Sequence, residues 1–439
     1  MQFYDKLHND IIRYETKVIT LLNQGMIFKD YCVKEIKRII QETFNSSNEY
    51  NIDVYGSYAT GLMIEASDID INIKLNHMSK DNLDNCFQTL CQRLEDENRF
   101  DAINPIGTAS VPVIKLLLNS EKFIKGKEDL ESNFKQYKEL PLFKHYLFDI
   151  SELTTIKIDV TFIMKNANNT SKKNNIEIKE NNSENNNNIN NNNNDNITNK
   201  TIKDNETVHD HDKSLGGEMS SVAYVKEQII KYPEIKFILR VLKRYFYYRK
   251  MNKPFLGGLS SYNLFLLILS YAKYFRIQQN LDLNIIDNAN KNKNKNKKVD
   301  VNLGIFLFNF LYFFKCSNFK QCVIDINSPN IYSYDLITQE KAQEYNYGKS
   351  IVIIDPLTGV NASKSSYKID EIHNILSKAF DFFHNEKLNY DKEGNTKVSK
   401  NNNNNKDILM GLPTSNKNDN NHGGGNIIEK FFMFDPDKL

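Results

Sequence analysis

The sequence predicts an α/β (α+β) protein with two folded units, a mixed sheet followed by a mainly helical unit. Between residues 48 and 165, short apolar runs of strand character alternate with an amphipathic helical pattern. From Val222 onward, apolar residues recur at helical spacing over long stretches. The chain has 439 residues, of which 40% are hydrophobic, so it can supply a core for each unit.

Helical spacing begins close to the N-terminus. "LHNDIIRYETKVITLL" and "YCVKEIKRIIQETF" both show it, so we expect N-terminal helices over residues 1–47 that pack on the later helical unit. "NIDVYGS", "DIDINIKL", "VPVIKLLL" and "IKIDVTFIM" are typical of strands, and "NLDNCFQTLCQRLED" is typical of a helix between them. A mixed sheet of about five strands is therefore expected over residues 48–165.

The second unit is predicted over residues 214–385. Its helices are expected in "AYVKEQIIKYPEIKFILRVLKRYFYYRK", "SSYNLFLLILSYAKYF" and "LGIFLFNFLYFFK". Asparagine-rich stretches interrupt or follow the two units, and they hold too few apolar residues to offset the entropy of ordering. We expect disorder in an insert at 166–213, in a loop at 287–299 and in most of a tail at 386–439, and excision of these stretches should leave function intact.

Composition narrows the class of protein. The net charge of +2 neither requires nor excludes a nucleic-acid partner, so a polyanion site would have to be a local patch. The sequence shows no run of 18 apolar residues and no signal-peptide pattern, which argues against membrane insertion and secretion. Five scattered cysteines without a CxxC pair favour a reducing intracellular compartment.

Three aspartates are candidates for catalysis. Asp68 and Asp70 alternate in one predicted strand and so share a face, and Asp159 stands alone among apolar neighbours in another strand. If the two strands are adjacent, three carboxylates converge and repel one another unless cations intervene. Oxygen ligands of this kind select Mg²⁺ or Mn²⁺, and a pair of ions suits phosphoryl transfer. A DxD pattern alone is also typical of a solvated sheet edge.

Gly56 and Ser57 precede the paired aspartates at the start of a short turn. Glycine lets the backbone approach a phosphate, and the turn that follows directs free N–H groups toward it. A Gly-Ser pair alone carries little information, but the combination "GSYATGLMIEASDIDI" with a later isolated strand aspartate indicates a nucleotide site.

These motifs in combination resemble a known family. "GSYATGL…SDIDI" is similar to the signature of the DNA polymerase β-type nucleotidyltransferase superfamily. "VPVIK", "IDVTF", "VLKRYFYYRKMNKPFLGGLSSYN" and "IVIIDPLTGVNASKSSY" extend the resemblance to the noncanonical poly(A) polymerases, the terminal nucleotidyltransferases with a PAP-associated domain, formerly called DNA polymerase sigma. It covers about residues 4 to 385 apart from the two inserts.

The resemblance implies a palm-like nucleotidyltransferase domain over 48–165 and a central, PAP-associated domain over 214–385. It implies template-independent transfer of AMP from ATP to RNA 3′ ends, as in RNA processing, surveillance or decay. By the same resemblance the metals would be held by three residues: Asp68, Asp70 and Asp159. The nucleotide would be bound by Gly56 and Ser57, by Lys243 and Ser261 on the triphosphate, and by Tyr262 stacked on the base. From the residues alone, Lys243 could equally be a solvated helix lysine and Tyr262 a core residue.

Base choice would lie in "DPLTGVNASKSSY", where Asn361 and Lys364 match the base-side positions and Asp355 shapes the loop. This loop is one residue shorter than in many poly(A)-adding relatives, and Ala362 replaces an aspartate. Uridine-adding relatives often carry a histidine here, whereas His373 falls in the helix that follows. The loop therefore favours ATP over UTP, with a terminal uridylyltransferase or a catalytically idle scaffold as the alternatives.

Partners are expected from the family as well. No RRM, KH domain or zinc knuckle is recognisable in the sequence. We therefore expect the substrate RNA 3′ end to be delivered by an RNA-binding adaptor protein, with an RNA helicase as a further partner, and no DNA template. The family also favours the nucleus over the cytoplasm.

Overall fold

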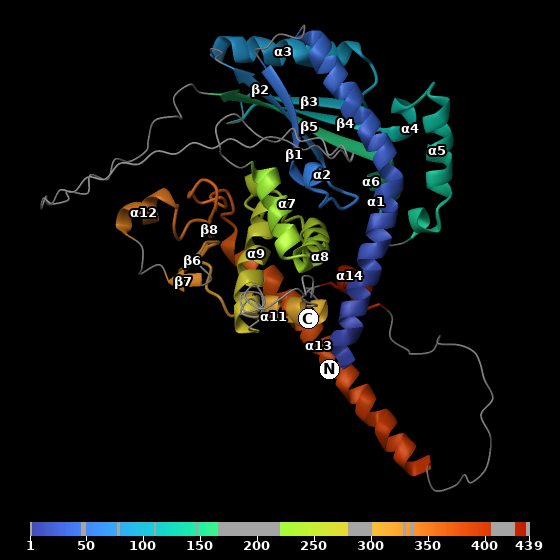
Figure 1. Ribbon diagram of the computed structural model, residues 1–439, viewed down its shortest axis with the longest axis vertical. Coiled ribbons are helices and arrows are strands. Elements are labelled where there is room, and N and C mark those ends of the chain that lie inside the picture. The colour runs from blue at the N-terminus through green and yellow to red at the C-terminus, as the bar shows by residue number, and fades with distance from the viewer. Residues whose placement is uncertain are drawn as a thin grey trace, which may run out of the picture.

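The computed structural model describes residues 2–44, 50–76, 80–108, 111–145, 148–165, 220–279, 301–327, 331–333, 338–404 and 426–435. The predicted insert at 166–213 and loop at 287–299 lie outside these residues. Figure 1 shows a sheet with flanking helices above a helical unit, and one long helix running along both.

The first unit is built on a five-stranded mixed sheet, as predicted. The strand order is β1-β2-β5-β4-β3, and only the β2–β5 pair is parallel. The strands are β1 (Tyr50–Tyr55), β2 (Ile69–Asn76), β3 (Ala102–Ile106), β4 (Val113–Asn119) and β5 (Thr155–Lys165). β3 was not among the predicted strands because its sequence, AINPI, contains a proline and few buried residues. Within a sheet, proline is tolerated mainly at an edge strand, and β3 is at the edge of this sheet.

Short helices connect and flank these strands. Helix α3 packs against β3 and β5, and α5 lies beside the long N-terminal helix (Figure 1). The helices of this unit are α2 (Gly56–Thr60), α3 (Lys80–Asp96), α4 (Ser120–Phe123), α5 (Glu128–Glu139), the 3₁₀ helix η1 (Pro141–Lys144) and α6 (Ile150–Thr154).

The N-terminal helices predicted over 1–47 form one helix instead, α1 (Gln2–Thr43). It packs on both units, on α8, α11 and α14 of the helical unit and on α3 and α5 of the sheet unit. Gly25 permits a close approach to α5, because a Cβ there would lie 3.3 Å from the hydroxyl oxygen of Tyr137. The expected packing on the helical unit is therefore present, and α1 contacts the sheet unit as well.

The second unit consists mainly of long helices. They are α7 (Ser221–Lys231), α8 (Glu234–Tyr248), α9 (Ser261–Gln278), α11 (Leu303–Lys315) and α13 (Ile369–Asn404), with η2 (Pro254–Leu256) before α9. A small sheet of order β7-β6-β8 lies beside α9. It consists of β6 (Cys322–Asp325), β7 (Ile331–Ser333) and β8 (Val352–Ile354), joined through α12 (Gln339–Glu344).

In the tail over 386–439, which was predicted to be mostly disordered, the structure contains helix in two places. Helix α13 continues to Asn404, and residues Ile427–Met433 form α14, which packs on α1, α8 and α13. The ring of Phe431 stacks on Tyr245 with centroids 4.3 Å apart. The apolar residues of "IIEKFFM" are too few to predict an isolated helix, and they are ordered by partners distant in sequence.

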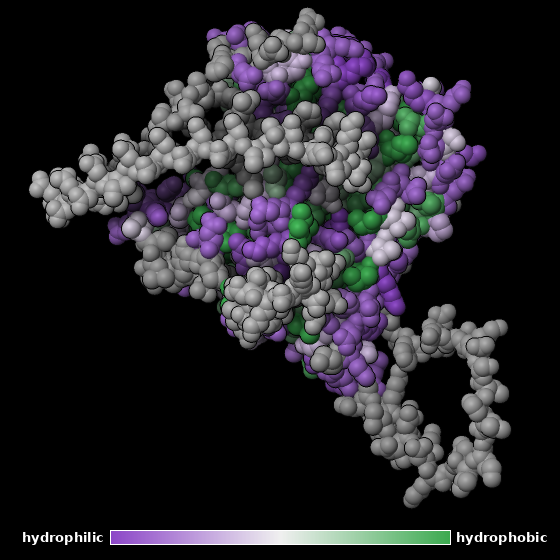
Figure 2. Space-filling model, in the orientation of Figure 1, coloured by the Kyte–Doolittle hydropathy of each residue, from purple (hydrophilic) through white to green (hydrophobic). Residues whose placement is uncertain are grey.

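The hydropathy of the surface agrees with the polar and charged residues counted in the sequence. Figure 2 shows a mostly hydrophilic face on which hydrophobic residues occur in small groups. Among the described residues, no helix is both long and apolar enough to cross a membrane.

Candidate active site

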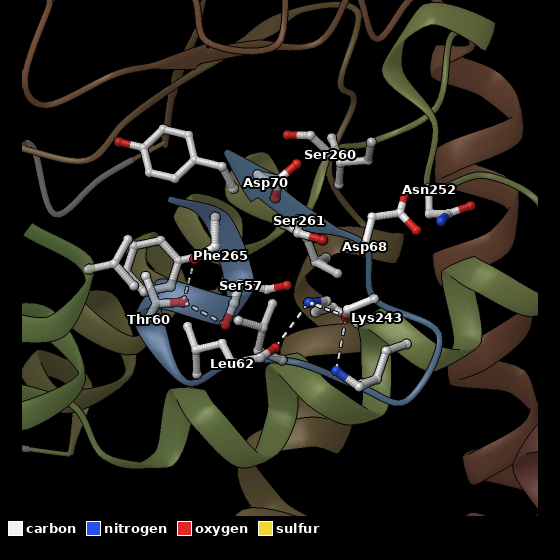
Figure 3. A pocket seen from close by; sticks show the side chains of 18 of the residues that line it. Ser57, Thr60, Leu62, Asp68, Asp70, Lys243, Asn252, Ser260, Ser261 and Phe265 are labelled. Atoms are coloured by element: carbon white, nitrogen blue, oxygen red, sulfur yellow. Dashed lines mark hydrogen bonds between the residues drawn. The ribbon is translucent and has the colours of Figure 1, made fainter. Parts of the chain in front are cut away.

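A cavity of about 580 Å³ lies between the sheet unit and the helical unit. Figure 3 shows side chains from both units around it. Residues from α2, from the start of β2 and from α7, α8 and α9 line it. Seven residues predicted from the sequence lie on its wall: Gly56, Ser57, Asp68, Asp70, Lys243, Ser261 and Tyr262.

The turn after β1 brings the backbone against one of the aspartates. Gly56 has φ +67°, and a Cβ at this position would lie 2.1 Å from Oδ2 of Asp70. Only glycine meets both conditions without displacing the carboxylate. Gly61, with φ +72°, ends the short helix α2 that carries Ser57. The local sequence thus brings the backbone of Gly56 directly beside the carboxylate of Asp70.

The strands that carry Asp70 and Asp159 are adjacent, which is the condition for the three carboxylates to converge. Asp68 immediately precedes β2, Asp70 is within β2, and Asp70 is in register with Asp159 on the parallel strand β5. Residues in register on neighbouring strands point to the same face of the sheet. Asp68 and Asp70 line the cavity, but Asp159 does not. Its carboxylate forms an ion pair with Lys115, the residue opposite it on β4.

The charges of these carboxylates are coupled. Burial, and then the negative charges of Asp159 and Asp68, raise the pKa of Asp70 to about 7. Burial and Asp159 also raise the pKa of Asp68, even though its side chain still reaches solvent. Each carboxylate is therefore more easily accommodated when a cation is nearby.

Two carboxylates of the cavity wall can bind a divalent cation. Asp68 and Asp70 offer hard oxygen donors on one cavity wall, and their mutual repulsion favours cation binding. Within the described part of the chain, however, no three His, Cys, Asp or Glu side chains are gathered closely enough to hold an ion. One carboxylate oxygen of Asp159, Oδ2, is engaged by Lys115. The residues fit a cation held first by Asp68 and Asp70, and the predicted pair of ions stays a prediction.

Lys243 enters the cavity from α8. Its ammonium group donates to the carbonyl of Leu62 at 2.9 Å and lies 3.4 Å from the hydroxyl oxygen of Ser67 (Figure 3). Burial and the nearby Arg240 lower its pKa to about 7, against the opposing influence of Asp70 and Asp68. An ammonium group has three donors, so one remains beyond these two contacts for a ligand in the cavity.

Ser261 and Tyr262 stand at the start of α9. The hydroxyl of Ser260 caps this helix by accepting from the N–H of Asn263 at 3.0 Å. The Tyr262 hydroxyl donates to Asp355 at 3.3 Å, and its ring is nearly parallel to that of Phe265, with an interplanar angle of 20°. Two contacts thus fix a ring on the cavity wall in a single orientation.

The two predicted base-side residues are not in the cavity wall. Asn361 is buried, and its amide group donates to the carbonyls of Tyr345 at 2.7 Å and Ile351 at 3.1 Å. Its side-chain oxygen accepts from two backbone N–H groups, so the side chain holds its own loop together. Lys364 is exposed outside the cavity, whereas Asp355 lines it.

His373 lies on α13, where its Nε2 is 2.9 Å from the carbonyl of Lys315. This is consistent with its prediction as an ordinary helix residue.

Sequence reasoning missed several residues of the site. Val225 of α7 and Asn252 before η2 line the cavity, but nothing in their local sequence indicates this. Lys115 had a usable signal. In "VIKLLL" it occupies the polar position of an alternating strand, next to the strand that carries Asp159.

Together, the palm-type sheet, the paired aspartates and the cavity closed by a helical unit define a nucleotidyltransferase fold. Residues 12–131 match the family model described as "Poly(A) RNA polymerase, mitochondrial-like, central palm domain". The chain is also similar to the polymerase core of TRAMP, an RNA surveillance complex. The identity is 16%, the TM-score is 0.53, and the match covers 87% of each chain.

The chain is also similar to the Cid1 poly(U) polymerase. The identity is 14%, the TM-score is 0.44, and the match covers 82% of this chain and 89% of that one. The family model agrees with the resemblance to the noncanonical poly(A) polymerases over residues 12–131, and the TRAMP polymerase core shares the fold.

Proposed function

We propose that this protein is a template-independent adenylyltransferase that adds AMP from ATP to RNA 3′ ends. One observation carries the proposal: a single cavity brings together Asp68 and Asp70, the Gly56–Ser57 turn, and Lys243 with Tyr262 from the opposite unit. Carboxylates, a backbone turn, a cation and an aromatic ring are what a nucleoside triphosphate requires for its metal, phosphates and base.

The residues of the cavity have separate proposed roles at the phosphates, the base and the cation. Gly56 and Ser57 let the backbone approach the phosphates, and Lys243 offsets part of their negative charge. The ring of Tyr262, held by Asp355, offers a face on which a base stacks. Asp68 and Asp70 would hold a divalent cation, which would neutralise part of the triphosphate charge and lower the pKa of the attacking 3′-hydroxyl.

The preference for ATP over UTP is the finer part of this proposal. It is supported by the loop from Asp355 to Tyr367, in which the sequence has no histidine. Because Asn361 is engaged inside that loop, we assign base contacts to Tyr262 and Asp355 before Asn361 or Lys364.

Partners and location belong to the proposal as well. We propose that an RNA-binding adaptor delivers the RNA 3′ end and that a helicase acts alongside it. In support, the similar TRAMP core belongs to an RNA surveillance complex, and no separate RNA-binding module is recognisable in the sequence. Location in the nucleus is proposed on the family resemblance alone.

A nucleotide-incorporation assay tests the proposed function. Purified protein, a labelled RNA oligonucleotide and Mg²⁺ are mixed with each nucleoside triphosphate separately, and ladders are expected with ATP. Asp68→Ala and chelation of the metal should each abolish the ladder. Asp53→Ala is the matched control, because Asp53 lies on β1, forms a surface ion pair with Lys74 and is outside the cavity.

Three results would overturn part or all of this proposal. Ladders that persist in Asp68→Ala would point to a contaminating enzyme. A tenfold preference for UTP would replace the adenylyltransferase by a uridylyltransferase. Absence of incorporation with every nucleotide would favour the idle scaffold.

A further inference from the structure

Three cationic side chains of α8 converge on one short stretch of the sheet unit. This stretch, residues 61–67, joins the end of α2 to Asp68, and we call it the 61–67 segment. The carbonyls of Gly61, Leu62 and Met63 all accept hydrogen bonds from α8. Three consecutive backbone acceptors are thus held by side chains from the other unit.

Arg240 makes the most of these contacts. Its Nε donates to the carbonyl of Met63 at 3.0 Å, and one terminal nitrogen donates to the carbonyl of Gly61 at 2.5 Å. The other terminal nitrogen forms an ion pair with Glu15 of α1. Arg240 is 3% exposed and Glu15 is 8% exposed, so these contacts are shielded from water.

A second arginine holds the same segment one turn later. Arg244 forms a buried ion pair with Glu65, and its guanidinium lies about 5 Å from the ring centroids of Phe148 and Tyr248. Phe432 of α14 covers it from a third side, at 5.6 Å. The 61–67 segment is therefore fixed at both its start and its middle.

Stability alone does not account for this arrangement. Buried ion pairs contribute little net stability, because desolvation offsets most of their attraction, and apolar replacements are often as stable. A guanidinium group offers something else, a rigid fork of donors that fixes the positions of its acceptors. Asp68 follows the segment directly, and a displacement of about 1 Å at a reacting group can cost about 100-fold in rate.

We propose that Arg240 is a positioning residue. Backed by Glu15, it fixes the 61–67 segment and thereby Asp68, which makes α1 and α8 part of the catalytic apparatus. The effect on rate rests on the proposed function, whereas the effect on the segment does not.

The experiment compares Arg240→Met with Arg276→Met. Arg276 is the matched control because it forms an equally buried pair with Glu234, through bonds of 2.9 and 2.8 Å, without contacting the 61–67 segment. Steady-state kcat and KM for ATP, thermal unfolding and amide hydrogen exchange are measured on the full chain. Arg240→Met should lower kcat by about 100-fold, with KM changed less than threefold. The amides of residues 62–69 should exchange at least tenfold faster.

Arg276→Met should lower the unfolding temperature to a similar extent while kcat and exchange in the 61–67 segment stay within threefold of wild type. If Arg240→Met does not fold, Arg240→Lys keeps the charge but loses the fork, and it should still lower kcat by at least tenfold with little loss of stability. Equal kcat losses in the Arg240 and Arg276 variants, or wild-type exchange in both Arg240 variants, would refute the positioning role. An inactive wild-type protein would refute the proposed function instead, and the exchange comparison would still decide the positioning of the segment.

Discussion

Asp70 is held between a backbone turn and a second carboxylate. The space beside it is so limited that a Cβ at Gly56 would meet its carboxylate oxygen, and on the neighbouring strand Asp159 lies in register with it. Burial and the repulsion from Asp159 and Asp68 raise the pKa of Asp70 to about 7. The fold thus keeps Asp70 in surroundings that disfavour its negative charge, which is typical of a functional site.

This shift predicts how stability depends on pH without metal. Because the pKa of Asp70 is about 7 when folded and near its ordinary 3.8 when unfolded, the folded protein binds a proton more tightly between these values. The contribution of Asp70 to stability should therefore fall as pH rises from about 4 to about 7. Over this rise in pH, the free energy of unfolding of the wild type should fall relative to that of Asp70→Asn. The expected fall is at least about 1.4 kcal/mol, equivalent to one pKa unit.

Chemical denaturation in EDTA at several pH values measures this difference. Asp53→Asn serves as the control, since Asp53 is a surface carboxylate paired with Lys74. A difference between wild type and Asp70→Asn that does not vary with pH would contradict the predicted shift.

Among the elements, α14 contributes more than its seven residues suggest. The carboxylate of Asp10 accepts from the N–H of Ile427 at 2.8 Å, which ties the start of α14 to α1. On the other side, Phe431 stacks on Tyr245 of α8, and Phe432 covers Arg244. The helix therefore closes the region from which α8 reaches the 61–67 segment.

Truncation of the chain after residue 425 tests this contribution. It removes four buried apolar side chains, Ile427, Ile428, Phe431 and Phe432, and leaves Asp10 buried without its N–H donor. Burial of each such side chain is worth about 1.5–3 kcal/mol before the entropy of ordering the helix is subtracted. We expect a loss of at least about 3 kcal/mol in chemical denaturation. Truncation after Asp435 keeps α14 and is the control, and equal midpoints for the two truncations would show that α14 is dispensable.

In the molecule as a whole, α1 joins the two units along their length. Its N-terminal part packs on α11, where a Cβ at Gly304 would meet the carbonyl oxygen of Tyr4. Further along, Phe28 packs edge-on against Phe134 of α5. One continuous helix thus contributes its buried face to a hydrophobic core that includes residues of both units (Figure 1).

This arrangement predicts a single cooperative unfolding transition for the wild-type chain. Ile27→Pro should divide it, because proline removes the helical hydrogen bond to residue 23 and breaks the helix where its contact with α5 of the sheet unit begins, at a cost of about 3 kcal/mol. Ile27 is 41% exposed, so Ile27→Ala removes little core packing and serves as the control. Differential scanning calorimetry should show two resolved transitions for Ile27→Pro and one for Ile27→Ala. One transition for both variants would mean that the units are coupled by other contacts.

The sequence could predict what short-range patterns encode. Alternation and helical spacing identified β1, β2, β4 and β5 and the helices α7, α8, α9 and α11, because burial of one face imposes its period on the residues. The spacing of Asp68 and Asp70 and the isolation of Asp159 identified the carboxylates for the same reason. Gly56 was predicted from its chemistry, and the structure adds the contact that excludes any other residue.

Only the tertiary structure decided which distant groups meet. Arg240 donates to Met63, 177 positions away, Lys115 engages Asp159, and Asn361 turns into its own loop. No local period carries such pairings, since they depend on how the strands are ordered and how the helices cross. Several side chains that line the cavity were therefore readable from the sequence, whereas the contacts that hold them in place arise from the packing of the whole chain.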